Sequence, residues 1–375
     1  MKTLAPTSRT VRKQGFTLIE ILVALSVTAL MVTLMVNITI GVLNVWNRSS
    51  GTLTTGNQAR TLMDQIAQDL QGAIFKRDGN VWLAATVQKD QSGLGDAGYS
   101  NAKWTKDAQP NASVKPGYLE RSLDLAATRT GGTDALATED QNKLENVRFG
   151  QAGVWLRFFT NVSGSDQTNP QKISAPRAVS YQICRVKIGS TLSDQVGYSL
   201  YRSEVRPDYT FTNGYTIIAP AYDQPAALSS EWDAATIRKP HGSRIIANNV
   251  VDFGVRLLEK NAANELIEKF PATRLGTGAL VSAPATAPVN YLVTSSATPT
   301  YTSYGSTVTP TTGFPVVAEV MVRILTQEGV NKLQAFESGK VTAPAGTTDA
   351  EYWWALAEQN SNVFIRRVEI KSTAL

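Results

Sequence analysis

One stretch near the start of the chain constrains the fold more than any other, because it carries no charged residue from position 21 to position 47. From Phe16 it reads FTLIEILVALSVTALMVTLMVNITIGVLNVW. As a helix, residues 21–43 would be roughly 35 Å long at about 1.5 Å per residue, which is enough to cross a hydrocarbon core of about 30 Å. The serine and threonine hydroxyls in this run can bond to the preceding turn, so they do not prevent insertion. The sequence therefore predicts a membrane-spanning helix.

The residues before this run are basic. Lys2, Arg9, Arg12 and Lys13 stand in the first fifteen positions without an acid, and subtracting these four from the chain's 36 basic residues leaves 32 against 31 acids. A nucleic-acid-binding protein should carry its basic excess in the folded part, so we expect no nucleic-acid partner. Basic residues on one side of a span favour the cytoplasm for that side, which places everything after Trp46 outside.

Two ordinary interpretations of this region leave one residue unexplained. A cleaved secretory signal has an apolar stretch of about 7–15 residues and a small-x-small cleavage site, whereas this run is much longer and lacks such a site. A plain signal anchor explains the length and the charges. Neither explains Glu20, because an acid near the bilayer centre costs about 2.5–3.5 kcal/mol, and less toward the interface. An acid in such a segment indicates a function.

The residues around Glu20 resemble the signal of type IV prepilins and type II secretion pseudopilins. The shared features, over about thirty residues, are a basic leader with Arg12 and Lys13, then Gly15, Phe16, the letters TLIE and an unbroken apolar helix. The resemblance implies that a prepilin peptidase of the bacterial inner membrane cuts between Gly15 and Phe16 and methylates the new Phe16 amine. It also implies assembly with other pilin-like subunits.

The resemblance gives Glu20 a partner. Cleavage would create an α-amine at Phe16 with a pKa of about 7.7–8.0, one helical turn from Glu20 and mostly cationic. During assembly this amine can meet the Glu20 carboxylate of a neighbouring subunit, and a paired charge in a low-dielectric layer costs far less than an unpaired one. We therefore expect Glu20 to set the register between subunits.

A second helix is predicted after the span. Apolar residues recur at helical spacing, and most polar neighbours, Arg60, Asp64, Gln68 and Asp69 among them, are expected largely off the apolar stripe. The stripe consists of Ala59, Leu62, Met63, Ile66, Ala67, Leu70, Ala73 and Ile74. Poor helix formers at 47–52 and at 56 predict a frayed or bent joint, and Gly79 is expected to follow the end of the helix.

The remainder is predicted to be rich in strands. Alternating apolar residues occur at 153–160, 177–189, 196–206, 244–259 and 316–326, followed by a short helix at 348–359 with Trp353 and Trp354 and a last strand at 363–371. A helix followed by strands indicates an α+β fold in which the long N-terminal helix packs on an antiparallel sheet.

These patterns predict four parts. They are a basic leader at 1–15, a transmembrane helix at 16–47, an amphipathic stalk helix at 48–77 and a β-rich periplasmic head at 78–375. Two stretches of the head, near 88–145 and 271–315, have little periodicity and are expected to be inserted loops, the second exposed or partly disordered.

Two looser resemblances concern the head. Its segments Gln68-Asp69-Leu70 through Lys76-Arg77 and Leu200-Tyr201-Arg202 are similar to parts of the J-type minor pseudopilins. The C-terminal segments YWWALAE and NVFIRR resemble the Verru_Chthon cassette C pilin-like proteins. The head is longer than a typical J-type head.

The sequence contains no phosphate-binding loop and no nucleophile elbow, so we expect no enzyme and no cofactor. The single His241 stands among turn residues, and the single Cys184 alternates with apolar neighbours, which favours a surface and a packing role. A metal site is not expected, because one Cys and one His exclude the common zinc sets and Asp134, Glu139 and Asp140 lack calcium-loop spacing.

Two classes of function fit this sequence. The first is a minor pseudopilin or pilin-like structural subunit in a type II secretion or type IV pilus-like filament. The second is a pilin-anchored binding module for adhesion, substrate capture or DNA uptake, without a role in a filament. Both place the chain in the bacterial inner membrane as a single-pass protein, with its N-terminus in the cytoplasm, its helix in lipid and its head in the periplasm.

Overall fold

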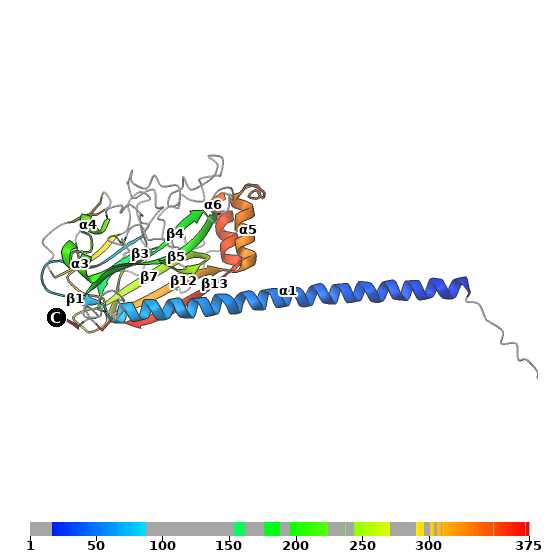
Figure 1. The fold of residues 1–375 in the computed structure, drawn as a ribbon, viewed down its shortest axis with the longest axis horizontal. Helices are drawn as coiled ribbons and strands as arrows, with labels where there is room; N and C mark the ends of the chain where they lie inside the picture. The colour runs from blue at the N-terminus through cyan, green and yellow to red at the C-terminus, as the bar shows by residue number, and fades with distance from the viewer. Residues whose placement is uncertain are drawn as a thin grey trace, which may run out of the picture. The chain divides into compact units, whose positions relative to one another are not determined.

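The computed structural model describes residues 17–87, 154–161, 176–187, 196–223, 237, 244–270, 290–295, 301–303, 306–308, 310–347, 349–371 and 373–374. The chain divides into two compact units between Leu53 and Thr54. The first unit contains the N-terminal part of one long helix, and the second contains the rest of that helix and all the strands (Figure 1). The long helix and antiparallel sheets confirm the predicted α+β class.

The helix α1 runs from Leu18 to Gln71 without a break. The residues of the predicted frayed or bent joint, at 47–52 and 56, keep the helical conformation, so the helix is not frayed there. Glycine costs only about 1 kcal/mol relative to alanine inside a helix, so Gly51 and Gly56 weaken it without ending it. The helix ends before Gly79, because Ile74–Phe75 forms strand β1 beside β14 (Thr373–Ala374).

The larger sheet has six antiparallel strands in the order β6-β5-β4-β3-β2-β9. Their bounds are β2 Val81–Val87, β3 Val154–Thr160, β4 Arg177–Lys187, β5 Val196–Val205, β6 Ile245–Asn248 and β9 Asn290–Thr294. The predicted strands at 153–160, 177–189 and 196–206 are confirmed.

The smaller sheet has four antiparallel strands in the order β13-β12-β7-β8. They are β7 Val250–Lys260, β8 Leu266–Phe270, β12 Val317–Leu325 and β13 Ser361–Glu369. The alternating stretch predicted at 244–259 forms two strands, because Asn249, with a φ of 61°, separates β6 from β7. The two halves thereby enter different sheets.

The predicted loop at 271–315 was wrong in part. β9 lies inside it and pairs with β2, and the short hairpin β10 (Tyr301–Ser303) and β11 (Ser306–Val308) follows. Tyr291, Leu292 and Val293 of β9 are buried. The other predicted insertion, 88–145, lies outside the described residues.

Four short helices complete the described part of the head. α3 (Pro207–Asn213) and α4 (Pro220–Asp223) follow β5. α5 (Gln327–Glu337) and α6 (Asp349–Gln359) connect β12 to β13 and lie side by side at one end of the sheets (Figure 1). The structure confirms the helix predicted at 348–359, whereas α5 was not predicted.

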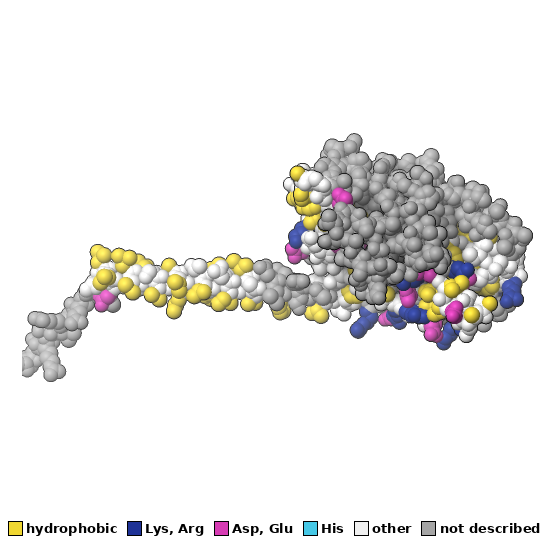
Figure 2. All heavy atoms as spheres, turned by 180° about the vertical axis from the view of Figure 1, so that it is seen from behind, with side chains coloured by type: hydrophobic (Ala, Val, Ile, Leu, Met, Phe, Trp, Pro, Cys, Tyr) yellow, Lys and Arg dark blue, Asp and Glu magenta, His cyan; other side chains and the backbone are white. Residues whose placement is uncertain are grey.

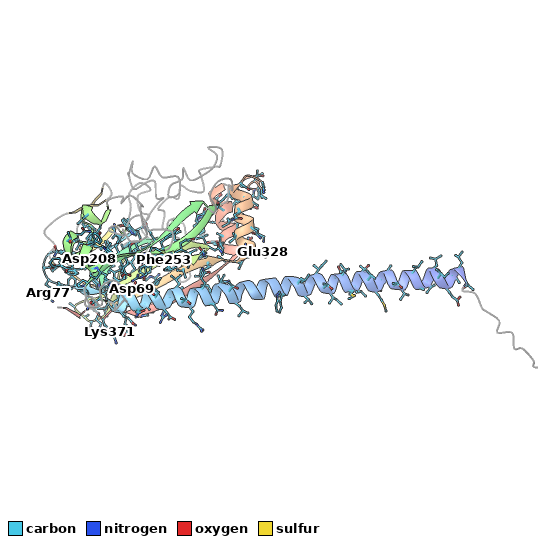
Figure 3. The ribbon with its side chains drawn as sticks, in the orientation of Figure 1. Asp69, Arg77, Asp208, Phe253, Glu328 and Lys371 are labelled. Carbon is cyan, nitrogen blue, oxygen red and sulfur yellow. The ribbon has the colours of Figure 1, made fainter. Side chains whose placement is uncertain are left out.

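The core lies between the two sheets and the C-terminal part of α1. Tyr181 of β4 and Phe253 of β7 have ring centroids 6.4 Å apart, so the sheets are in contact. Every residue of the predicted apolar stripe is buried, which confirms the amphipathic pattern. Asp69, a polar residue expected largely off the apolar stripe, is also buried, with 0% exposure. Figure 3 shows where Asp69 and Phe253 lie in this unit.

Candidate functional site: the apolar helix and its acid

The N-terminal part of α1 exposes its apolar side chains on all sides. Among the described residues one helix is long and apolar enough to cross a membrane, over the 26 residues Leu18–Leu43. Its large apolar side chains are exposed, from 49% at Val27 to 79% at Leu18, and Figure 2 shows them along the helix. In water such a surface would be strongly unfavourable, so a lipid or protein environment is required.

The polar residues inside this span bond within the helix. Four hydroxyls donate to backbone carbonyls three or four residues earlier, at 2.7–2.8 Å. Because each hydroxyl already has a backbone acceptor, it can lie in an apolar environment, as expected from the sequence. They are Ser26, Thr28, Thr33 and Thr39.

Glu20 forms a capping box with Thr17 at the start of α1. The backbone N–H and the hydroxyl of Thr17 both donate to Glu20 Oε2 at 2.9 Å, and the Glu20 N–H donates to Thr17 Oγ1 at 3.4 Å. This exchange satisfies donors that a helix start leaves unpaired. The sequence carries the signal for this cap, since threonine followed by glutamate three residues later before an apolar run is the capping-box pattern. The role expected of Glu20 was pairing with a neighbouring subunit alone.

Glu20 contributes a negative charge in the first turn of α1. It places one carboxylate at the positive end of the helix dipole, at the N-terminal end of the apolar surface. Arg12, Lys13, Gly15 and Phe16 lie outside the described residues, so the structure does not place the cut site or the amine that cleavage would create.

A second group of charged residues fixes α1 to the head. Arg202 of β5 donates from Nε to Asp69 Oδ2 at 2.6 Å and from Nη2 to Asp69 Oδ1 at 3.1 Å. The Tyr181 hydroxyl also donates to Asp69 Oδ2. Arg202 also bonds to Glu204, which in turn binds Arg177. Asp69 is therefore held by charge-assisted hydrogen bonds away from water.

The pKa values of this group follow from burial and charge. Burial raises the pKa of Tyr181 well above its usual value, and the adjacent Asp69 charge raises it further. Burial alone would raise the pKa of Glu204, but the positive charge and hydrogen bond of Arg202, with help from Arg177, lower it overall. The folded state thus favours a protonated Tyr181 and an ionised Glu204.

This group joins the segments 68–77 and 200–202 of the head. Asp69 stands in the first segment and Arg202 in the second, 133 residues later. Sequence spacing alone could not show this contact, because it depends on α1 crossing β5. The contact makes the two segments one structural unit within the head.

Two further buried carboxylates accept a tyrosine hydroxyl. Glu259 of β7 accepts from Tyr291 of β9 at 2.6 Å and so ties the small sheet to the large one. Glu337 of α5 accepts from Tyr198 of β5 and from Trp353 Nε1 of α6, the latter at 2.9 Å. Each pair joins elements that are distant in sequence.

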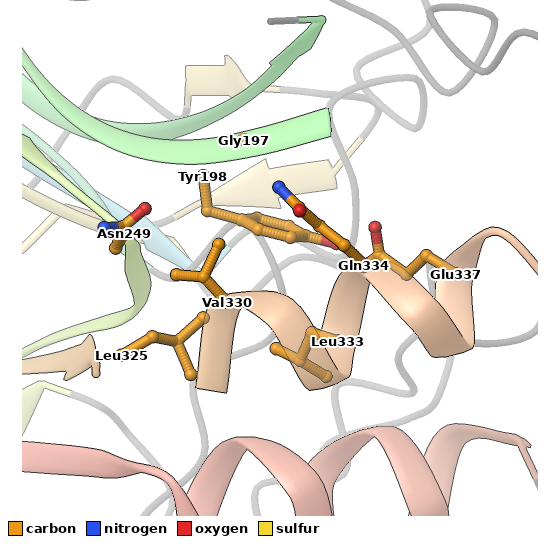
Figure 4. Close-up of a pocket in the computed structure, with 8 residues that line it drawn as sticks. All are labelled: Gly197, Tyr198, Asn249, Leu325, Val330, Leu333, Gln334 and Glu337. Atoms are coloured by element: carbon orange, nitrogen blue, oxygen red, sulfur yellow. The ribbon is translucent and has the colours of Figure 1, made fainter. Parts of the chain in front are cut away.

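Glu337 and Tyr198 also line a small pocket between α5, the start of β5 and the turn before β7 (Figure 4). Its other walls mix apolar and amide side chains. They are Gly197, Asn249, Leu325, Val330, Leu333 and Gln334. Two hydrogen bonds already hold Glu337 in place at the edge of this pocket.

The remaining sequence candidates cannot be placed. His241, Asp134, Glu139 and Asp140 lie outside the described residues, as does the side chain of Cys184, whose backbone belongs to β4. Within the described ranges, no group of three or more His, Cys, Asp and Glu side chains could hold a metal ion.

Comparison with known proteins gives one match. Residues 11–36 match the model of the prokaryotic N-terminal methylation motif. No curated protein and no solved structure matches the chain. The motif covers the cut site expected at Gly15 and Phe16, the acid Glu20 and the apolar span as far as residue 36.

Proposed function

From the prepilin-type methylation motif that this chain carries, the signal of type IV pilins and pseudopilins, we propose that it is a minor pilin-like subunit of a filament. The observation that carries the proposal is the continuity of the motif at 11–36 with the exposed apolar span Leu18–Leu43. A prepilin signal requires such a helix, first as a membrane anchor and then as the part that packs against other subunits.

The first proposed step is processing. A prepilin peptidase of the inner membrane hydrolyses the bond between Gly15 and Phe16 and transfers a methyl group to the Phe16 amine. Arg12 and Lys13 hold the leader on the cytoplasmic side, in line with the basic bias of that side. The helix stays in the membrane, and the head lies in the periplasm.

The second proposed step is assembly, with Glu20 setting the register. Its carboxylate is satisfied by Thr17 in the single subunit, through contacts made within one turn. A cationic Phe16 amine on a neighbouring subunit offers a stronger, charged partner. Exchange of the Thr17 contacts for that amine favours one axial offset between subunits.

The finer assignment is a minor pseudopilin of type II secretion, which the looser J-type similarity favours. The bond between Asp69 and Arg202 supports it by giving both similar segments a shared structural role. The proposed role is structural, without catalysis or a cofactor. A tethered module that binds an external ligand is the competing function, and the experiment below separates the two.

The test compares partner recovery by three forms of the full chain, namely wild type, Glu20→Gln and Thr17→Ala. Glu20→Gln keeps an oxygen that can complete the capping box but removes the charge, whereas Thr17→Ala removes the hydroxyl and keeps the charge. After extraction in mild detergent, other pilin-like subunits should co-purify with wild type and Thr17→Ala but not with Glu20→Gln. Membrane insertion and cleavage should persist in all three.

Equal recovery of these subunits by wild type and Glu20→Gln would remove the register role. It would favour the tethered binding module, which has no filament partner to lose.

A further inference from the structure

The N-terminal unit has one exposed aromatic side chain among its described residues. Trp46 is 70% exposed on α1, three positions after the apolar span ends at Leu43. The other large apolar side chains that are exposed among the described residues of this unit are aliphatic or methionine. In the sequence, Phe16 and Trp46 are the only aromatic residues of the first 53, one at each end of the apolar run.

The distance along α1 fits a whole bilayer rather than its hydrocarbon core. Glu20 and Trp46 are 26 positions apart on one continuous helix, or roughly 39 Å at about 1.5 Å per residue. A hydrocarbon core is about 30 Å thick, and the bilayer with its headgroup layers is about 40–45 Å thick. If Trp46 lies in one headgroup layer, Glu20 therefore reaches the opposite one.

We propose that Trp46 is an interfacial anchor that binds the outer phospholipid headgroup layer and thereby holds Glu20 in the inner headgroup layer. Tryptophan prefers this layer because its ring is largely apolar and its N–H needs a polar partner. Among the described side chains of this helix, no other aromatic residue is exposed near Trp46. The proposal rests on the membrane insertion proposed above and states how deep Glu20 lies in the bilayer.

This depth changes the energetics of Glu20. An ionised acid is far cheaper in the headgroup layer than near the bilayer centre. Its contacts with Thr17 reduce the cost further, because the carboxylate accepts two hydrogen bonds from its own chain. At the average tilt of about 20°, the reach along the bilayer normal is still about 37 Å, which is longer than the hydrocarbon core of about 30 Å. The unassembled subunit thus keeps its acid at the cytoplasmic surface, where the leader is cut.

The test measures which residues are accessible from the cytoplasmic side. In a Cys184→Ser background, the full chain carries one cysteine at Leu18, Leu22, Ser26 or Leu30. Inverted inner-membrane vesicles are then treated with a membrane-impermeant maleimide. With Trp46 present, Leu18→Cys and Leu22→Cys should be labelled, and Ser26→Cys and Leu30→Cys should be protected.

Moving the anchor by one turn should move this boundary. Trp46→Leu with Val42→Trp draws the helix outward by about 6 Å, so labelling of Leu22→Cys should fall at least several-fold. Trp46→Leu with Ser50→Trp moves it inward, so Ser26→Cys should become labelled. Trp46→Tyr, which keeps an interfacial ring, is the matched control and should leave the boundary unchanged.

A boundary that stays in place in both shifted variants would overturn the anchor role of Trp46. Protection of Leu18→Cys in the wild-type background would overturn the proposed depth of Glu20. Labelling of all four positions, Leu30→Cys included, would instead show that the helix is not inserted and would contradict the proposed function itself.

Discussion

At the scale of single residues, Asp64 and Asp69 show how burial decides the value of an ion pair. Both lie on α1 and both bind an arginine of the head, Arg366 and Arg202 respectively. The Asp64 side chain is 61% exposed, whereas the Asp69 side chain is 0% exposed and has a bidentate partner. Water screens the first pair, whereas the carboxylate of the second pair is out of contact with water.

This contrast gives the first prediction. Asp69→Asn should lower the free energy of unfolding of the head by about 3–5 kcal/mol, because it leaves Arg202 without its main counter-charge in the interior. Asp64→Asn, the matched control on the same helix, should change it by less than about 1 kcal/mol. Urea unfolding of the detergent-solubilised chain, followed by tryptophan fluorescence, measures both. Similar midpoints for the two variants would contradict the assigned importance of Asp69.

The second prediction concerns acid. The pKa of Glu204 is lowered in the folded state, so below about pH 4.3 the unfolded chain takes up this proton before the folded chain does. Stability contributed by Glu204 is therefore complete above that pH and is lost as the pH falls further. Glu204→Gln should flatten the acid side of a plot of urea midpoint against pH. A slope equal to that of wild type would contradict this prediction, because other groups would then control the loss of stability in acid.

At the scale of elements, the join between the two sheets depends on a glycine. A Cβ at Gly313 would lie 2.2 Å from Oε2 of Glu259, the residue that accepts from Tyr291 across the sheets. Glu259 is buried and has little room to move without losing that bond. A side chain at position 313 would therefore collide with the carboxylate of Glu259.

The third prediction uses this contact. Gly313→Ala should destabilise the head by about 1–3 kcal/mol, through overpacking and loss of the bond between Glu259 and Tyr291. Gly56→Ala is the control, because nothing lies within 4 Å of its Cβ position in α1. That change should stabilise the helix by about 0.5–1 kcal/mol. Thermal unfolding of both variants would contradict this account if Gly313→Ala unfolded at or above the wild-type temperature.

Several of the strands that the sequence predicted have polar residues on one face, although the predicted β3 is buried on both faces. β12 shows this pattern, since Glu319 and Arg323 alternate with apolar residues. β2 was missed because it reads VWLAATV and its described side chains are buried on both faces, which removes the period of two. α5 was missed because Gly329 and several polar residues obscure its start, although Thr326 caps it through the Gly329 N–H.

The candidate site was predictable in part for a similar reason. A local motif identified Glu20, and a complete local pattern would also have identified Thr17 as its partner. Asp69 was expected to point outward, because helical spacing treats an acid as a surface residue. Its partners, Arg202 and Tyr181, come from strands more than one hundred residues later, so only the tertiary structure shows them.

At the scale of the whole molecule, the proposed topology has one membrane crossing. The four basic residues before the span and the near-neutral remainder predict a cytoplasmic leader and an external head. As the fourth prediction, a reporter active only in the cytoplasm should be inactive when fused after Lys76, and one active only in the periplasm should be active there. Activity of the cytoplasmic reporter at this position would contradict the proposed topology.

The central claim, processing at a prepilin signal, yields the last prediction. In cells with an active prepilin peptidase, mass spectrometry of the N-terminal peptide should find a mature chain that begins at Phe16 and carries one added methyl group on its amine. Gly15→Leu should leave the chain uncut but still inserted, because the apolar span is unchanged. An intact Met1 form in such cells, or an unmethylated Phe16, would contradict the account.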